Sequence, residues 1–343
     1  MPHLTPEPGP DAAPCTVAIA GATTPVGLSL RAWLAARGHP VIALSRQPPE
    51  DEGAGLWRRC DLFVAAEVQD ALEGVDVVLD LASASVPSGR LTQACVEDLD
   101  LIIADNLGRA ARAHGVSALV LADATGLDGR GRPRDHARLD ELIAALTLPT
   151  GPPRRPVPLH PTASHAAQAS AILDAAGLSA SSDPHFPSLT PAPRRAAWQG
   201  RSTVRSVQRL PTPTGLGAAE VASAYLEWLG RAFWPLLRVT QAADDATIAI
   251  AGLGLTVLSF TARSHGGEAG LVCFGITGGV AVRSGEPPGQ LEFRLTPDGR
   301  SVVIAIHDFV PGLPWWLYRV TQAPVHLQVM SAFGRYLTRA QRA

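Results

Sequence analysis

Short apolar runs alternate with helical patterns over the first half of the chain. Apolar runs at 16–20, 41–44, 75–81 and 118–121 are typical of buried parallel strands. Apolar residues at helical spacing predict helices over 25–37, 67–73 and about 92–114. A later strand at 157–159 and a short helix over 166–176 complete the pattern. Repeated strand–helix units predict an α/β fold built on a doubly wound parallel sheet.

The second half follows a different order. A strand near 204–210 precedes a helix at about 217–233 that carries Val221, Tyr225 and Leu229 on one face. Strand-like runs follow near 236–240, 246–251, 255–262, 271–276, 290–295 and 301–309, and helices over 314–322 and about 325–341 close the chain. Residues 290–295 alternate apolar and polar side chains, which predicts a half-buried antiparallel strand. This order predicts an α+β domain with an antiparallel sheet and a long C-terminal helix. It is the order of helix-grip domains, in which a curved sheet wraps a helix and can enclose an apolar cavity.

Prolines and aromatic residues divide the chain. Ten prolines lie between 149 and 193, a density that neither a continuous helix nor a central strand tolerates. Fourteen aromatic residues follow residue 197 and four precede it. We therefore predict a disordered tail over 1–14, a parallel-sheet domain over 15–180, a Pro/Ser-rich linker over 181–200 and the α+β domain over 201–343.

Composition narrows the classes of function. A net charge of -2 gives no electrostatic case for a nucleic-acid or anionic-membrane partner. The N-terminus lacks the pattern of a signal peptide, and the longest apolar stretch, 247–262, is too short to span a membrane. Four scattered cysteines predict no metal site, so we expect a cytoplasmic protein. All 29 positive residues are arginine, which excludes any mechanism that needs a lysine amine.

A glycine loop follows the first predicted strand. Its residues are Gly21, Ala22, Thr23, Thr24, Pro25, Val26 and Gly27. A glycine turn at a strand–helix junction lets backbone N–H groups meet a pyrophosphate at the helix N-terminus. The loop resembles the GxxGxxG loop of extended and atypical short-chain dehydrogenases/reductases, above all the NmrA-like and sugar-epimerase-like branch. It keeps both outer glycines, whereas Thr24 replaces the middle one and brings a Cβ that would obstruct close approach of a cofactor.

This resemblance implies an NAD(P)-binding Rossmann-type domain and further cofactor contacts. Ser45 and Arg46 end the second strand without an acidic residue for the ribose hydroxyls. An arginine there suits a 2′-phosphate, so the predicted cofactor is NADP rather than NAD; a solvated loop arginine is the alternative. The other implied contacts are Asp61 and Leu62 at the adenine, Leu81, Ala82 and Ser83 near the nicotinamide ribose, and Asn106 on a helix. Asn106 is equally compatible with a surface position.

The catalytic Tyr-x-x-x-Lys pair of the family is missing. The first tyrosine is Tyr225, and no lysine is present. Thr125 as a hydroxyl donor and His136 as an acid/base are the candidate substitutes, although a solvated histidine at a helix start fits the sequence as well. Two hypotheses follow. One is an NADP-dependent oxidoreductase or epimerase-like enzyme acting on a small apolar carbonyl substrate. The other is a non-catalytic NAD(P)H-sensing or hydrophobic-ligand-binding protein.

The segment 307–326 resembles an uncharacterised START-like C-terminal domain fused to some NmrA-like and epimerase-like proteins. Candidate residues for a ligand cavity in it are His307, Trp315, Trp316, Tyr318 and His326. Packing in the core is the alternative for the aromatic residues, and burial with hydrogen-bond partners is the alternative for the histidines. The terminal helix also carries Arg319, Arg335, Arg339 and Arg342, which suits either a membrane-surface element or packing against a sheet.

Overall fold

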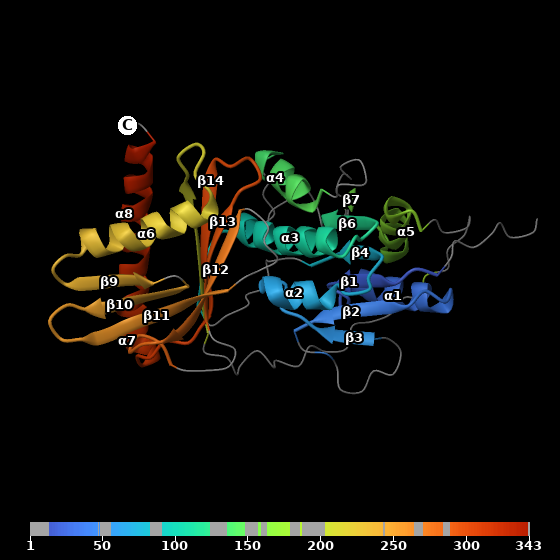
Figure 1. The fold of residues 1–343 in the computed structure, drawn as a ribbon. Helices are drawn as coiled ribbons and strands as arrows, with labels where there is room; N and C mark the ends of the chain where they lie inside the picture. The colour runs from blue at the N-terminus through green and yellow to red at the C-terminus, as the bar shows by residue number, and fades with distance from the viewer. Residues whose placement is uncertain are drawn as a thin grey trace, which may run out of the picture. The chain divides into compact units, whose positions relative to one another are not determined.

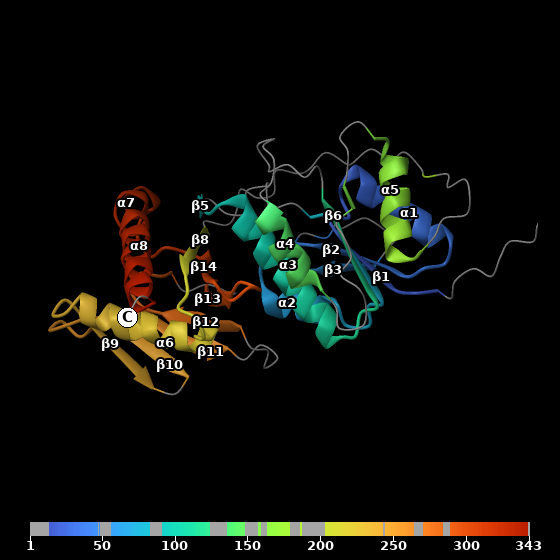
Figure 2. The same ribbon diagram turned by 90° about the horizontal axis from the view of Figure 1, so that it is seen from above.

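The chain divides into two compact units. A computed structural model describes residues 14–46, 48, 56–82, 91–123, 136–147, 157–158, 163–178, 186, 203–242, 244–263, 270–283 and 289–341. Unit 1 comprises Met1–Ser83, Asn106–Arg134 and Leu146–Pro193, and unit 2 comprises Ala84–Asp105, Asp135–Ala145 and Arg194–Ala343. Figures 1 and 2 show the elements of both units.

Unit 1 is built on a parallel sheet. The strands are β1 (Val17–Ala20), β2 (Val41–Ser45), β3 (Leu56–Arg59), β4 (Val77–Asp80), β6 (Ala118–Asp123) and β7 (Val157–Pro158), in the order β3-β2-β1-β4-β6-β7. Every neighbouring pair is parallel. The helices are α1 (Pro25–Ala36), α2 (Ala65–Ala71), α5 (His165–Ala176) and the second half of α3 (Val96–Ala113). The predicted doubly wound α/β architecture is confirmed.

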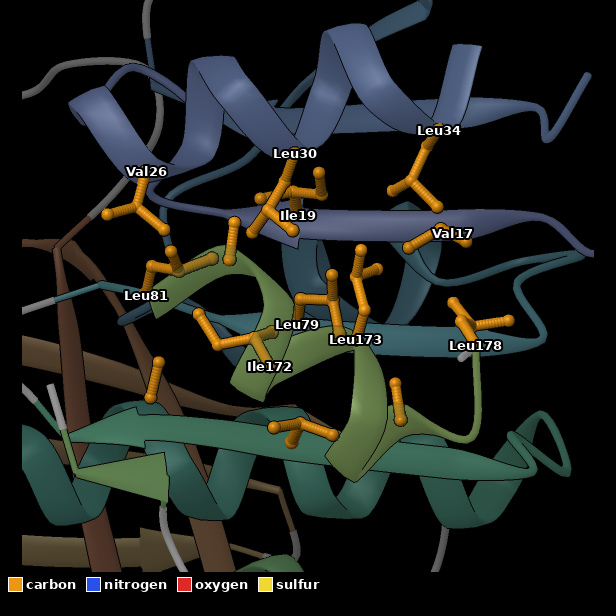
Figure 3. Close-up of a cluster of buried hydrophobic side chains, with 14 of the residues drawn as sticks. Val17, Ile19, Val26, Leu30, Leu34, Leu79, Leu81, Ile172, Leu173 and Leu178 are labelled. Atoms are coloured by element: carbon orange, nitrogen blue, oxygen red, sulfur yellow. The ribbon is translucent and has the colours of Figure 1, made fainter. Parts of the chain in front are cut away.

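The apolar core of unit 1 lies between one face of this sheet and the helices α1 and α5. Figure 3 shows Leu30 and Leu34 of α1 next to Ile19 and Val17 of β1, with side chains of α5 completing the cluster. All four of these residues are buried. The strands carry apolar side chains on both faces, as is typical of a parallel sheet covered by helices. This rigid layer fixes the ends of the strands, where the glycine loop begins.

Unit 2 is built on a largely antiparallel sheet. Its strands are β5 (Leu91–Gln93), β8 (Val204–Pro211), β9 (Leu237–Ala242), β10 (Asp245–Ile250), β11 (Leu255–Arg263), β12 (Leu271–Gly278), β13 (Gln290–Leu295) and β14 (Ser301–Phe309). Their order is β5-β8-β14-β13-β12-β11-β10-β9, and only the β5–β8 pair is parallel among the strands described. The helices are α4 (His136–Leu146), α6 (Ala218–Ala232), α7 (Trp315–Val320) and α8 (Gln322–Ala340). The predicted α+β region with a C-terminal helix is confirmed.

The two faces of the unit 2 sheet differ in chemistry. Aromatic side chains of α6, β13 and α8 meet on one face. The ring centroid of Tyr225 lies 5.6 Å from that of Phe293 and 5.1 Å from that of Phe333. On the other face the register aligns Gln290 with His307 and Glu292 with Ala305. This second face carries charged side chains, and the side chains of α3 and α4 reach it.

The structure corrects the expectation for residues 290–295. The alternating pattern predicts one exposed face, yet Gln290, Glu292 and Arg294 are all buried. The charged groups of Glu292 and Arg294 pair with each other and with further charged side chains of unit 2, which makes their burial tolerable. Strand β5 and the contacts of α3 and α4 also place 84–105 and 135–145 with unit 2, whereas the predicted parallel-sheet domain runs unbroken over 15–180.

None of the helices in the described part of the chain is long and apolar enough to cross a membrane.

Candidate functional site

The glycine loop emerges at the topological switch point of the parallel sheet. Strand β1 lies between β2 and β4, and its two neighbours are reached by connections that run in opposite directions. In open α/β sheets the crevice beyond the carboxyl ends of the strands at this point is where ligands bind. Gly21 follows β1 directly, so the loop begins in that crevice.

Both outer glycines of the loop are required by packing. Gly21 has a positive φ of 76°, and a Cβ on it would lie 2.7 Å from the carbonyl oxygen of Leu81 after β4. A Cβ on Gly27 would lie 2.6 Å from the carbonyl oxygen of Gly21. The loop therefore packs backbone to backbone against the end of β4, and the first turn of α1 packs directly against the loop.

Thr24 caps the helix that follows. Its hydroxyl accepts a hydrogen bond from the amide of Gly27 at 3.1 Å, and its own amide donates to the carbonyl of Gly21 at 3.0 Å. Pro25 takes the first helical position, where its missing N–H costs nothing. The Thr24 hydroxyl therefore lies against the first turn of α1 and engages the amide of Gly27. Obstruction of a cofactor by the Thr24 Cβ stays a prediction.

Three amides of the loop remain available to an anion. Among the hydrogen bonds of the described residues, none engages the N–H groups of Ala22, Thr23 or Val26. These groups surround the N-terminus of α1, where the helix dipole favours negative charge. The loop can therefore hold a phosphate group through backbone donors alone.

The other predicted cofactor positions lie at the same edge of the sheet. Ser45 ends β2, and its carbonyl accepts from the amide of Cys60 at 2.9 Å; Arg46 follows it and is partly buried. Leu81 donates its amide to Ala20 at 3.0 Å, so it continues the β1–β4 pairing. The amide of Ala82 donates to the buried carboxylate of Asp80 at 2.9 Å. Ser83 lies outside the described residues.

Two further predicted contacts form one local arrangement. The Asp61 carboxylate accepts from the amide of Phe63 at 3.1 Å and shapes the turn before α2. The Asn106 side chain donates to the carbonyl of Leu62 at 2.9 Å. Asn106 is buried, so the alternative of a surface residue is wrong. Its amide ties α3 to the loop that carries Asp61 and Leu62.

The structure does not describe the side chains of the two catalytic candidates. Thr125 lies outside them, and of His136 the structure gives only its place as the first residue of α4. Tyr225 lies in the aromatic core of unit 2, where burial raises its pKa to about 12. It therefore cannot replace the missing tyrosine of the Tyr-x-x-x-Lys pair.

A network of charged groups occupies the second face of the unit 2 sheet. His307 Nε2 lies 3.0 Å from Glu292 Oε1, and Arg294 donates to Glu292 Oε2 at 3.1 Å. Arg294 also pairs with Asp105 of α3. His307, Glu292 and Arg294 are each at most 1% exposed, so these three charges are shielded from water, and Asp105 is buried except for 7% of its surface. We call these four residues the buried ion network.

Burial and charge act against each other in this network. Burial alone would lower the pKa of His307, but the carboxylates of Glu292 and Asp308 outweigh it and raise the pKa to about 9. Burial would raise the pKa of Glu292, but His307 and Arg294 hold it well below its usual range. At neutral pH the imidazolium and the carboxylate are therefore both charged and stabilise each other.

A second arginine anchors the start of α3 to the same face. Arg209 of β8 donates to Asp98 at 2.7 Å and to both carboxylate oxygens of Glu141 in α4 at 2.8 and 2.9 Å. Asp98 and Asp105 are seven residues apart, which places them on one face of α3 two turns from each other. These ion pairs were not predicted from the sequence. The signal for them was an arginine on each of two strands, together with acidic residues at helical spacing in 96–113.

The five residues predicted to line a ligand cavity lie in different surroundings. His307 lies on the charged face, whereas Tyr318 is buried and Trp315 is partly buried in the aromatic cluster on the opposite face. Trp316 is 69% exposed. His326, on α8, is partly buried, and burial lowers its pKa to about 4. His307 lies on the charged face of the sheet and His326 on a helix that packs against the aromatic cluster, and a pocket shared by the two histidines stays a prediction. Core packing is confirmed for Tyr318.

Comparison with known proteins supports the assignment of the first unit. Residues 21–148 match a protein family described as NAD(P)H-binding. The chain is also 23% identical over 296 residues to the auxiliary protein GraX of Staphylococcus aureus (strain NCTC 8325 / PS 47), covering 85% of this chain and 84% of GraX. The N-terminal domain is thus an NAD(P)-binding Rossmann-type domain.

Two solved structures each match about a third of the chain. Uronate dehydrogenase from Agrobacterium tumefaciens is 26% identical with a TM-score of 0.27, covering 33% of this chain and 42% of that one. UDP-N-acetylglucosamine 4-epimerase from Bacillus cereus is 22% identical with a TM-score of 0.26, covering 32% of this chain and 35% of that one. The chain thus matches less than half the length of either enzyme.

Proposed function

We propose that the protein binds NADP in unit 1 through the loop from Gly21 to Gly27. The observation that carries the proposal is the loop itself. It has two positions that only glycine fits, and three amides at the N-terminus of α1 that donate to no group among the described residues. Backbone donors of this kind suit a pyrophosphate. The match of residues 21–148 to an NAD(P)H-binding family supports the same ligand.

The preference for NADP over NAD rests on Arg46. It follows Ser45 at the end of β2, one strand away from the glycine loop, where the adenosine ribose of a bound cofactor would lie. A guanidinium there would pair with a 2′-phosphate, and neither Ser45 nor Arg46 offers a carboxylate to the hydroxyls of NAD. Asp61 and Leu62 would contact the adenine in the same arrangement.

Titration calorimetry with NADPH and NADH tests this proposal. We expect NADPH to bind in the micromolar range or tighter. Arg46→Ala should weaken NADPH about tenfold to a hundredfold and leave NADH unchanged, since one charge-assisted contact contributes about 1.5–3 kcal/mol. Arg37→Ala is the matched control, because Arg37 is exposed at the other end of α1. If neither nucleotide binds below millimolar concentration, the proposal fails.

The first candidate activity is hydride transfer to a small apolar carbonyl compound. No lysine is present in the chain, so proton delivery would come from water or from Thr125 or His136 rather than from a tyrosine–lysine pair. Bound NADPH would supply the hydride, and the protein would contribute binding and orientation. Oxidation of NADPH by apolar aldehydes and ketones, lost on Thr125→Val or His136→Gln, would support this candidate.

The second candidate is a non-catalytic NAD(P)H sensor or an apolar-ligand binder. Burial of Tyr225 in unit 2 and the missing lysine favour it, and the relative that spans most of the chain is named an auxiliary protein. NADPH binding without oxidation by any carbonyl compound would select this candidate. A START-like role for unit 2 would add binding of an apolar ligand between its sheet and α8.

A cytoplasmic setting goes with both candidates. The four cysteines are free, with Cys60 and Cys273 buried. Free thiols are typical of a reducing compartment.

A further inference from the structure

Large exposed apolar side chains gather in unit 2. Within the described part of the chain they are Trp234, Leu236, Leu253, Leu255, Val280, Trp316, Val320 and Val325. All eight belong to unit 2, and the described residues of unit 1 contribute none. We call these eight residues the apolar rim. A concentration of this kind marks an interaction site rather than the scattered exposure of ordinary surfaces.

Backbone hydrogen bonds join the segments of the apolar rim. The amide of Ala251 donates to Leu236 at 2.9 Å, which joins the turn after α6 to the turn after β10. Figures 1 and 2 both show these two turns side by side. The amide of Val280 donates to Thr256 at 3.0 Å, and the amide of Gly312 donates to Ala281 at 2.9 Å. The segment before α7 therefore lies beside the end of β12, which in turn lies beside the start of β11.

Several residues of the apolar rim lie at turns or on the short helix α7. Leu253 is 76% exposed at a turn between Gly252 and Gly254, both with positive φ. On α7, Trp316 and Val320 are exposed four residues apart, so they share one side of the helix.

Within the described residues of the segments that form the apolar rim, the exposed charged side chains have one sign. Arg238, Arg283 and Arg319 are exposed in its segments. The sequence has no Asp or Glu at 232–242, 247–257, 279–283 or 309–343. The nearest acidic residues of β9 and β10 are Asp244 and Asp245, which lie at the end of that hairpin opposite to Leu237 and Ile250. The net charge of -2 for the whole chain averages over this local excess of arginine.

We propose that the apolar rim binds the surface of an anionic lipid membrane. Tryptophan and aliphatic side chains would enter the boundary between headgroups and acyl chains, and the three arginines would pair with lipid phosphates. A second copy of the chain is a poorer occupant, because a two-fold contact would bring arginines together without a carboxylate to pair with them. Anionic lipid supplies both the apolar layer and the negative charge.

Co-sedimentation of the full chain with vesicles tests the proposal. We expect binding to vesicles of phosphatidylglycerol and phosphatidylcholine, weakened by salt, and at least tenfold weaker binding to phosphatidylcholine alone. The double variant Trp316→Ser/Val320→Ser should lose at least tenfold in affinity. Arg319→Ser should lose about fivefold, since one basic residue near an anionic surface contributes about 1 kcal/mol. Arg300→Ser, an exposed arginine on the β13–β14 turn, is the matched control and should bind as the unaltered chain does.

Leu253→Ser guards against a folding artefact, because its side chain lies at a turn tip and packs little. It should keep the circular dichroism spectrum of the unaltered chain and still lose vesicle binding. The proposal is overturned if binding survives both Leu253→Ser and the double variant, or if phosphatidylcholine alone binds equally well. It is also overturned if the unaltered chain does not bind the anionic vesicles; a dimer in sedimentation equilibrium that Leu253→Ser dissociates would then identify a second copy of the chain as the occupant.

Discussion

The glycine loop of unit 1 and the buried ion network of unit 2 are two polar centres built by opposite means. The loop uses backbone: glycines that permit close approach, and amides of Ala22, Thr23 and Val26 left for a ligand. The network uses charged side chains that pair with one another, as His307 does with Glu292 at 3.0 Å.

The glycine loop is suited to binding a ligand, whereas the buried ion network is suited to stabilising the fold. A site for an outside ligand must leave donors unengaged, as the loop does, and tolerate the water that fills it when empty. A buried network must satisfy its own charges, because an unpaired ion in the interior is costly. The loop should therefore respond to mutation mainly in cofactor affinity, and the network mainly in the free energy of unfolding.

The largest expected effect comes from breaking the network. Arg294→Met should lower the free energy of unfolding by about 3–5 kcal/mol, because it leaves the carboxylates of Glu292 and Asp105 buried without their shared cation. Urea unfolding followed by circular dichroism measures it. Arg231→Met removes an exposed partner of Glu227 and should cost under about 0.5 kcal/mol. Equal effects of the two substitutions would refute the contrast drawn between buried and exposed pairs.

The pH dependence of stability should reveal His307. Its pKa is about 9 in the folded chain and about 6.5 in the unfolded chain. Between these values the folded state holds a proton that the unfolded state has released, so stability falls as the pH rises. The contribution is fully present below about pH 6.5 and amounts to about 2–3 kcal/mol lost by about pH 8.5.

His307→Gln isolates this contribution. Above about pH 8.5 buried thiols add a loss of the same sign, because burial raises the pKa of Cys60. The comparison is therefore made between pH 6.5 and 8.5, where the substituted chain should show a much flatter profile. Parallel profiles for the two chains would mean that His307 is neutral in the folded state.

The same difference explains what sequence could foretell. The loop from Gly21 to Gly27 is contiguous, so its place between a strand and a helix follows from local pattern. Glycine is required at Gly27 because the backbone of Gly21 lies close to it, and at Gly21 because the end of β4 at Leu81 does. Local sequence thus predicts most of this centre, together with the order of helices and strands around it.

The buried ion network depends on contacts between distant segments. Arg294 and Asp105 are 189 residues apart in sequence. Alternation in 290–295 predicts which side chains share a face but not what covers that face. Only folding brings α3 over β8 and β13, so polar side chains expected in solvent are buried.

A smaller effect, on affinity, should follow from crowding the loop. Gly27→Ala puts a methyl group 2.6 Å from the carbonyl oxygen of Gly21, so the backbone must shift. Overpacking of this kind costs about 1–3 kcal/mol, and we expect NADPH affinity to fall about tenfold to a hundredfold in calorimetry. Gly38→Ala is the control: Gly38 has a φ of 80° but open space around it, so it should lose stability without losing affinity. Unchanged affinity in Gly27→Ala would place the cofactor elsewhere.

The smallest effect concerns the amide of Gly27. Thr24→Ala removes the cap and should cost about 1 kcal/mol of stability, whereas Thr24→Gly should cost only a few tenths. Both substitutions release the amide of Gly27 from the Thr24 hydroxyl, but only glycine also removes the Cβ. With a fourth donor and a clear approach, Thr24→Gly should bind NADPH a few-fold more tightly than the unaltered chain. A weaker affinity in Thr24→Gly would instead mean that the cap holds the loop in its binding shape, and that the backbone centre also depends on one side chain.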